Sequence, residues 1–122
     1  MKKFIKSFGY AINGIYTTFK SERNFRIHII LMLFAIGVGI YLGLSVSEWC
    51  LIIFAIGFVL STELFNTAIE RLGDETAKGK QSLFFKNVKD ISAGAVLISA
   101  ITALVIGILV LFIPFIHRMM EL

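Results

Sequence analysis

Three long apolar stretches constrain the fold of this chain more than any other feature of its sequence. Stretches without a single charged residue cover residues 27–44, 49–60 and 91–116. A helix needs about 20 mostly apolar residues to cross the hydrocarbon core of a bilayer. We therefore predict an all-α membrane protein whose three transmembrane helices cover about residues 27–45, 47–70 and 91–116.

The composition agrees with a small integral membrane protein. Hydrophobic residues make up 57% of the 122 residues and charged residues 16%, whereas soluble chains have about 45–50% and about 25%. A single Pro and a single Cys exclude a disulfide scaffold, a Cys-rich zinc module and a collagen-like repeat. The net charge of +4 alone would be compatible with nucleic acid, but in a chain this apolar it favours anionic lipid or a phosphorylated substrate as a partner. We expect one domain over residues 1–122.

The segment before the first apolar stretch has a different pattern. Apolar residues recur at helical spacing at Phe4, Ile5, Phe8, Ile12, Ile15, Tyr16 and Phe19, and Lys2, Lys3, Lys6 and Lys20 lie among them. This pattern is typical of an amphipathic helix that lies in the membrane surface with its lysines toward the headgroups. We predict such a surface helix over residues 2–20; the alternative is a packed helix of a soluble bundle.

The distribution of basic residues predicts the orientation in the membrane. Basic residues cluster before the first span and between the second and third, at Lys2, Lys3, Lys6, Lys20, Arg23, Arg26, Arg71, Lys78, Lys80, Lys86 and Lys89. The junction at residues 45–48 has none, and Ser45 and Glu48 there resemble a capping box. By the positive-inside rule, the N-terminus and the 71–90 loop are cytoplasmic in a multi-pass protein of the cell inner (cytoplasmic) membrane.

The acidic residues are scarce and lie mostly at the predicted cytoplasmic side. Six of the eight are Glu22, Glu63, Glu70, Asp74, Glu75 and Asp90. Glu63, Asn66 and Glu70 share one helix face, with the two carboxylates about 10 Å apart along the axis. Ionisable groups inside a span are costly and indicate function by default. For Glu70 the alternative is an interfacial ion pair with Arg71 or Lys89.

This arrangement suits phosphoryl transfer at the membrane surface. Carboxylates from different segments, beside lysines, match a hard cation such as Mg²⁺ that carries phosphate oxygens. Glu22 and Glu70 would hold that metal, and Glu63 would take a proton from a lipid hydroxyl. Lys89 would neutralise phosphate charge. The string from Gly73 to Lys80 lacks the spacing and the Ser/Thr of a P-loop.

Three segments resemble a known family. Residues 63–70 read ELFNTAIE, which closely resembles the signature E-x-x-N-[ST]-A-I-E of the bacterial diacylglycerol kinase and undecaprenol kinase family. Residues 22–26 (ERNFR), Lys89-Asp90 and residues 92–97 (SAGAVL) resemble it as well. The likeness covers nearly the whole chain, with a surface helix and three spans in the same order.

The resemblance implies a homotrimer of small lipid kinases whose active sites are shared between subunits. It implies MgATP as the phosphoryl donor and a membrane lipid alcohol as the acceptor. Carried over by position, Glu63 is the general base, Glu22 and Glu70 hold the metal, and Asn66 positions groups between them. The residues that meet the nucleotide are Tyr10, Lys89 and Asp90, and Asp74 is a supporting residue. The loop at residues 78–88 departs from the pattern of the family that the chain resembles and looks one residue longer, so no nucleotide contact is assigned there.

Rival functions follow from the same residues. The segment at residues 22–25 looks more like the undecaprenol-type members, which favours undecaprenol; the alternative acceptor is diacylglycerol. A small proton-coupled or multidrug transporter would explain Glu63 but not the gathering of the other charged residues. A non-catalytic assembly subunit would leave those acids unused.

A few further residues are expected to be structural. Gly39 and Gly43 form a small-xxx-small pair, which favours close helix packing, and Trp49 suits an interfacial anchor. The third span carries a similar stripe of small residues, among them Ser92 and Ser99. His28 and His117 lie at the ends of spans on opposite sides of the membrane, so they cannot form one metal site.

Overall fold

The computed structural model describes residues 1–77 and 82–122, and their regular structure is helical. The elements are α1 (Lys2–Ser21), α2 (Arg23–Leu42), α3 (Val46–Ala77), α4 (Leu83–Gly107), η1 (Ile108–Phe112) and α5 (Ile113–Met120). Three helical stretches are long and apolar enough to cross a membrane: Arg23–Leu42, Val46–Thr76 and Leu83–Met120. The prediction of an all-helical chain with three such helices is confirmed.

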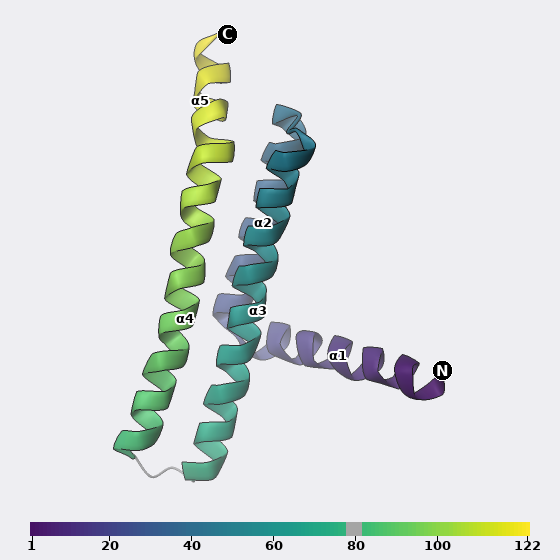
Figure 1. The fold of residues 1–122 in the computed structure, drawn as a ribbon, viewed down its shortest axis with the longest axis vertical. Coiled ribbons are helices and arrows are strands. Elements are labelled where there is room, and N and C mark those ends of the chain that lie inside the picture. Colours follow the sequence, from purple (N-terminus) through teal and green to yellow (C-terminus); the bar gives the residue numbers. More distant parts are fainter. Residues whose placement is uncertain (78–81) are drawn as a thin grey trace.

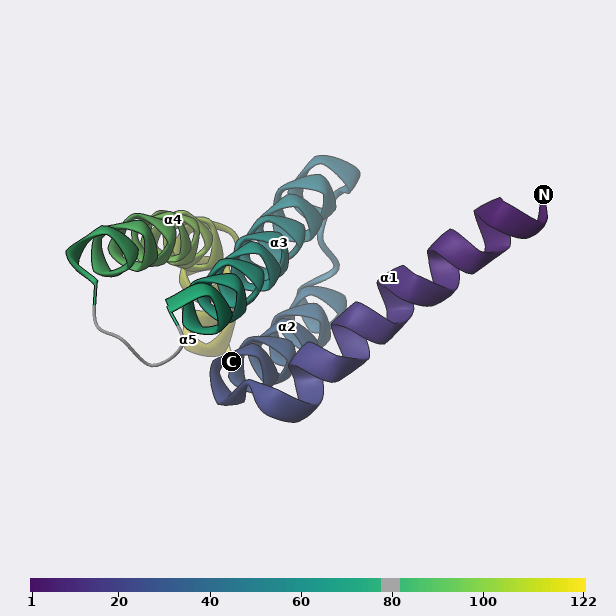
Figure 2. The ribbon, with the colours of Figure 1, turned by 90° about the horizontal axis from the view of Figure 1, so that it is seen from below.

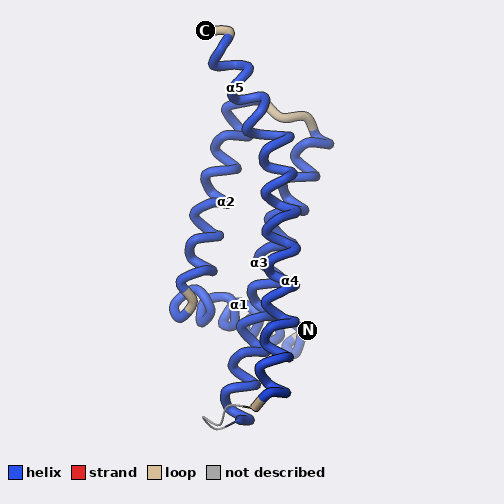
Figure 3. Tube along the Cα trace, turned by 90° about the vertical axis from the view of Figure 1, so that its left-hand side faces the viewer, coloured by secondary structure: helices blue, strands red, loops and turns tan. Residues whose placement is uncertain are grey.

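The three long helices run side by side, and α1 projects sideways from the bundle (Figures 1 and 2). α2 leads away from α1, α3 returns, and α4 with η1 and α5 leads away again as one rod. We call the end of the bundle from which α1 projects the α1 end. The ends of α3 and α4 continue beyond the level of α1 (Figure 3).

These continuations extend the helices beyond the expected segments. α3 reaches Ala77 and α4 begins at Leu83, so most of the 71–90 segment, expected as a loop, is helical. Local polar contacts accompany these turns: the Thr76 hydroxyl donates to the Leu72 carbonyl at 2.7 Å, and Lys86 Nζ lies 2.8 Å from Asp90 Oδ2. The apolar pattern of the sequence does not predict these helical turns, because their residues are mostly polar. Lys78 and Lys80 lie outside the described residues.

A corner at Glu22 joins α1 to α2. Glu22 has an extended backbone, with φ −108° and ψ 113°. The Arg26 guanidinium donates to the carbonyls of Phe19 and Lys20 at 2.8 and 2.9 Å, which satisfies two acceptors that the end of a helix leaves free. Phe25 is 1% exposed, so the corner is packed as well as capped.

At the α2–α3 junction, the structure confirms one prediction from the sequence and contradicts another. The Ser45 backbone N–H donates to Glu48 Oε1 at 3.0 Å, and the Glu48 N–H donates to Ser45 Oγ at 3.3 Å. The capping box is therefore confirmed. Gly43 has φ +67° and ends α2 in the left-handed conformation, so its expected role in helix packing is wrong: it is the C-cap.

α3 and α4 form the most extensive helix pair. Ser92 and Ser99 are buried, and the Ser99 hydroxyl lies 2.7 Å from the Thr62 hydroxyl of α3. Small residues allow such close helix approach in membranes, which was the expectation for this stripe. Farther along, the π-turn η1 ends at Phe112, two residues before Pro114, and is closed by a hydrogen bond from the Ile113 N–H to the Ile108 carbonyl. Proline lacks the N–H that would continue the α-helical ladder.

Candidate active site

The polar stripe of α3 lies on one continuous helix. Glu63 is 5% exposed, and Asn66 and Glu70 are half-buried. Asn66 Nδ2 donates to Glu70 Oε1 at 3.3 Å, so two members of the stripe contact each other directly. Because α3 continues through Gly73, Asp74 also lies on this helix. The predicted spacing of these residues on a helix is confirmed.

The buried carboxylate of Glu63 has a partner on α2. Nε2 of His28 lies 3.2 Å from Glu63 Oε1. The sequence pattern places His28 only at the end of a span and predicts no part for it in the site. The sequence does contain a signal for this contact, namely the distance of each residue from the α1 end of its helix. His28 follows Glu22 by six positions, and Glu63 precedes Glu70 by seven. At about 1.5 Å per residue, antiparallel helices bring these two side chains to the same level.

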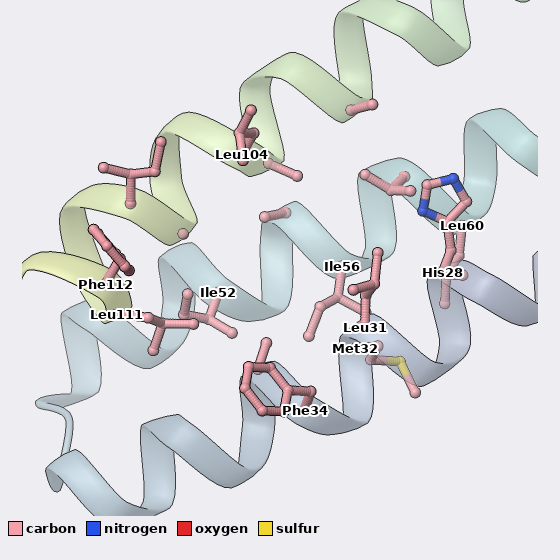
Figure 4. Close-up of a pocket in the computed structure, with 17 residues that line it drawn as sticks. His28, Leu31, Met32, Phe34, Ile52, Ile56, Leu60, Leu104, Leu111 and Phe112 are labelled. Carbon is pink, nitrogen blue, oxygen red and sulfur yellow. The ribbon is translucent and has the colours of Figure 1, made fainter. Parts of the chain in front are cut away.

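An apolar pocket begins at this histidine. It has a volume of about 560 Å³ and lies between α2, α3 and the α4–η1 rod. Figure 4 shows His28 and Leu60 at one end and Leu111 and Phe112 at the other. His28 is the polar side chain among the residues that line this pocket, and the others are aliphatic, aromatic, Met or Gly. The imidazole therefore contacts both Glu63 and the pocket.

Charged side chains at the α1 end form ion pairs between helices. Arg71 Nη2 lies 4.0 Å from Glu22 Oε1 and also contacts the Ser21 hydroxyl. Lys89 of α4 pairs with Asp74 of α3. The alternative interpretation of Glu70 required Arg71 or Lys89 as its partner. In residues 1–77 and 82–122, those two cations pair with Glu22 and Asp74 instead, and Glu70 accepts from Asn66.

The structure brings some of the predicted site residues together within one chain and leaves others apart. The ion pairs place Glu22 beside the end of α3 and Lys89 beside Asp74. Asp90 is engaged by Lys86 of its own helix. Tyr10 lies midway along α1, which projects from the bundle, and is 73% exposed. Tyr10 is therefore not part of the cluster formed by its own chain.

The oxygen atoms at the α1 end match the preference of a hard divalent cation. Asn66 Oδ1 is buried and has no hydrogen-bond partner in the described part of the chain, and the Glu70 carboxylate lies beside the same side chain. No three His, Cys, Asp or Glu residues among those described are close enough to bind a metal alone. Mg²⁺ is usually held by one or two carboxylates together with waters and substrate phosphates, so a sparse set of oxygen donors fits it.

Comparison with known proteins gives a consistent set of relatives. The profile described as "Prokaryotic diacylglycerol kinase" matches residues 9–111. A Bacillus subtilis protein named undecaprenol kinase is 39% identical over 93% of this chain and 91% of its own length. A Synechocystis protein named diacylglycerol kinase is 34% identical over 93% of this chain and 65% of its own length. A diacylglycerol kinase of Escherichia coli K12 is 27% identical over 93% of this chain and 92% of its own.

Proposed function

This chain belongs to the prokaryotic diacylglycerol kinase family and is a membrane lipid kinase, and from this premise we propose that it phosphorylates undecaprenol with MgATP. The observation that carries the proposal is the position of Glu63. Its carboxylate is buried in α3 and touches the polar end of an apolar pocket through His28. A base at that point meets the hydroxyl of a lipid whose chain lies in the membrane.

On the acceptor side, Glu63 acts as the general base. The lipid hydroxyl gives its proton to the Glu63 carboxylate as its oxygen attacks the γ-phosphorus, and the bond from that phosphorus to the β–γ bridging oxygen breaks. A correctly placed base contributes about 10²–10⁴-fold to such a step. The pocket volume of about 560 Å³ lies within the usual range of ligand sites, about 300–1,000 Å³. It accommodates part of the hydrocarbon chain.

On the donor side, Glu22 and Glu70 would hold Mg²⁺, and Asn66 would orient the groups between them. An ion bound there would supply positive charge to offset that of the phosphates. Lys89 and Asp90 meet the nucleotide. Lys89 forms an ion pair with Asp74, and Asp90 forms one with Lys86. The nucleotide therefore replaces Asp74 and Lys86 as the partner of side chains that are already charged.

We also propose that the working unit is a homotrimer with shared active sites, each chain contributing one domain over residues 1–122. The position of Tyr10 supports sharing, because α1 projects from the bundle that contains Glu63 and Tyr10 is 73% exposed. Exposed apolar side chains on α1, such as Phe4, Phe8 and Ile12, support a helix that lies in the membrane surface. The distribution of basic residues predicts that this surface is the cytoplasmic face of the inner membrane, which ATP can reach.

The choice of undecaprenol over diacylglycerol rests on two supports. The relative named undecaprenol kinase is 39% identical, and the pocket wall beyond His28 offers no polar side chain for the ester groups of a glycerolipid. Family membership gives no support to the transporter alternative.

The experiment compares initial rates of the purified protein with MgATP on undecaprenol and on diacylglycerol, each at the same mole fraction in detergent micelles. We expect undecaprenol to be phosphorylated faster. The reverse ranking would overturn the choice of lipid while leaving the kinase assignment intact, and phosphorylation of neither lipid would overturn the proposed reaction.

A further inference from the structure

A buried carboxylate in a membrane helix needs a polar partner, and Glu63 has one on another helix. Burial of an unpaired ionised group is strongly unfavourable, and buried polar groups are normally hydrogen-bonded. In the described part of the chain, the contact recorded for the Glu63 carboxylate is the one with His28 Nε2 at 3.2 Å. This separation is an ion-pair distance, and the contact joins α2 to α3.

The second property of His28 is its place in the pocket wall. The pocket is lined by seventeen residues, of which His28 is the polar one. A lipid chain in the pocket would therefore have its hydroxyl at the end where His28 and Glu63 meet. His28 thus contacts the proposed base, Glu63, and is also the polar side chain that the lipid hydroxyl would meet in the pocket.

We infer that His28 is a positioning residue for phosphoryl transfer: it orients the Glu63 carboxylate at the head of the lipid pocket. This inference rests on the proposed role of Glu63 as the base. The contact with the His28 imidazole at 3.2 Å holds Oε1 of Glu63, which leaves Oε2 to accept the proton of the lipid hydroxyl. His28 takes no part in the proton transfer itself, so the bonds that form and break are those described above. Its effect comes from geometry, since a base displaced by about 1 Å can cost about 100-fold in rate.

The matched variants are His28→Gln and His28→Met. Both new side chains are unbranched and of similar length, but only Gln keeps an N–H donor near the position of Nε2. Met suits an apolar wall, so we expect both proteins to fold. Size-exclusion chromatography in detergent gives the folded fraction, by which the rates are normalised. His117→Met, at the exposed histidine of α5, is the control for loss of a histidine.

We expect kcat for undecaprenol to fall about 10- to 100-fold in His28→Met, consistent with loss of alignment, while the KM for MgATP stays unchanged. His28→Gln should recover most of this loss, and His117→Met should match the wild type. In a Glu63→Gln background, His28→Met should cause little further loss, because a residue that acts through another is not additive with it. Equal rates for the Gln and Met variants, whether high or low, would overturn the inference.

The same set separates this inference from the proposed function. If Glu63→Gln alone keeps wild-type activity, Glu63 is not the base and the proposed mechanism fails. If Glu63→Gln is inactive while His28→Met is fully active, the base assignment stands and the role of His28 is wrong.

Discussion

At the scale of single residues, the chain combines an acid that is buried with acids that are accessible on the same helix. Glu63 lies at membrane depth and is 5% exposed, whereas Glu70 is half-buried two turns nearer the α1 end. Similar carboxylates in different surroundings are suited to different tasks. A buried carboxylate suits proton transfer with a lipid hydroxyl, and an accessible one suits a cation that arrives with a soluble donor.

This difference predicts distinct effects of two equivalent substitutions. We expect Glu63→Gln and Glu70→Gln both to lower lipid phosphorylation strongly, by about 10²-fold or more for the loss of the base. Only Glu70→Gln should shift the Mg²⁺ concentration required for half-maximal rate, because only Glu70 is assigned to the metal. The measurement is the rate of phosphate incorporation from ATP at a series of Mg²⁺ concentrations.

Glu121→Gln, near the C-terminus and exposed, is the control for removal of a carboxylate. Normal activity and normal Mg²⁺ dependence in both Glu63→Gln and Glu70→Gln would show that the roles of these residues are wrongly assigned.

The residues on α3 could be predicted from sequence, whereas their partners could not. Glu63, Asn66 and Glu70 are related by helical spacing alone, which periodicity shows directly. His28 belongs to another helix, and its contact depends on the depth and rotation of α2 against α3. The Arg71–Glu22 and Lys89–Asp74 pairs likewise depend on how the helices extend at the α1 end.

At the level of the helices, interactions at the helix ends determine where each helix of the bundle begins and ends. Arg26 caps α1, Gly43 ends α2, and the Ser45–Glu48 capping box begins α3. The capping box was predictable because its residues are close in sequence and their chemistry is local. The extents of α3 and α4 were not, because their polar turns at the α1 end interrupt the apolar pattern by which membrane spans are recognised.

The approach of Trp49 to Gly39 gives a prediction about stability. A Cβ atom on Gly39 would lie 2.8 Å from Trp49 Cη2 and 3.0 Å from Leu44 Cδ1. We expect Gly39→Ala to lower the free energy of unfolding by about 1–3 kcal/mol, because overpacking forces neighbouring groups to move. The measurement is thermal unfolding in detergent micelles.

Gly37→Ala, two residues earlier on the same helix, is the matched control. Nothing lies within 4 Å of its added Cβ, and Ala is preferred over Gly inside a helix by about 0.5–1 kcal/mol. The Gly37 variant should therefore unfold at the wild-type temperature or above. If Gly39→Ala is as stable as Gly37→Ala, the packing of Trp49 on α2 is not as described.

At the level of the complete bundle, the described residues of one chain do not bring all the predicted site residues together. Glu63, His28 and the pocket belong to the same three-helix unit, but Tyr10 is carried away on α1. No set of three metal-binding side chains forms within the described residues of one chain. These facts agree with the proposal that neighbouring chains complete each other's nucleotide sites, while the lipid pocket and its base remain within one subunit.

In the proposed orientation, the acids of the α1 end face the compartment that contains ATP. Cysteines introduced at two serine positions report which side of the membrane each position faces, in a Cys50→Ser background because native Cys50 is exposed. Ser82→Cys lies just before α4 and Ser47→Cys lies near the start of α3. A membrane-impermeant maleimide is applied to intact spheroplasts and to lysed ones. We predict that Ser47→Cys is labelled in both, and that Ser82→Cys is labelled only after lysis; labelling of Ser82→Cys in intact spheroplasts would contradict the account.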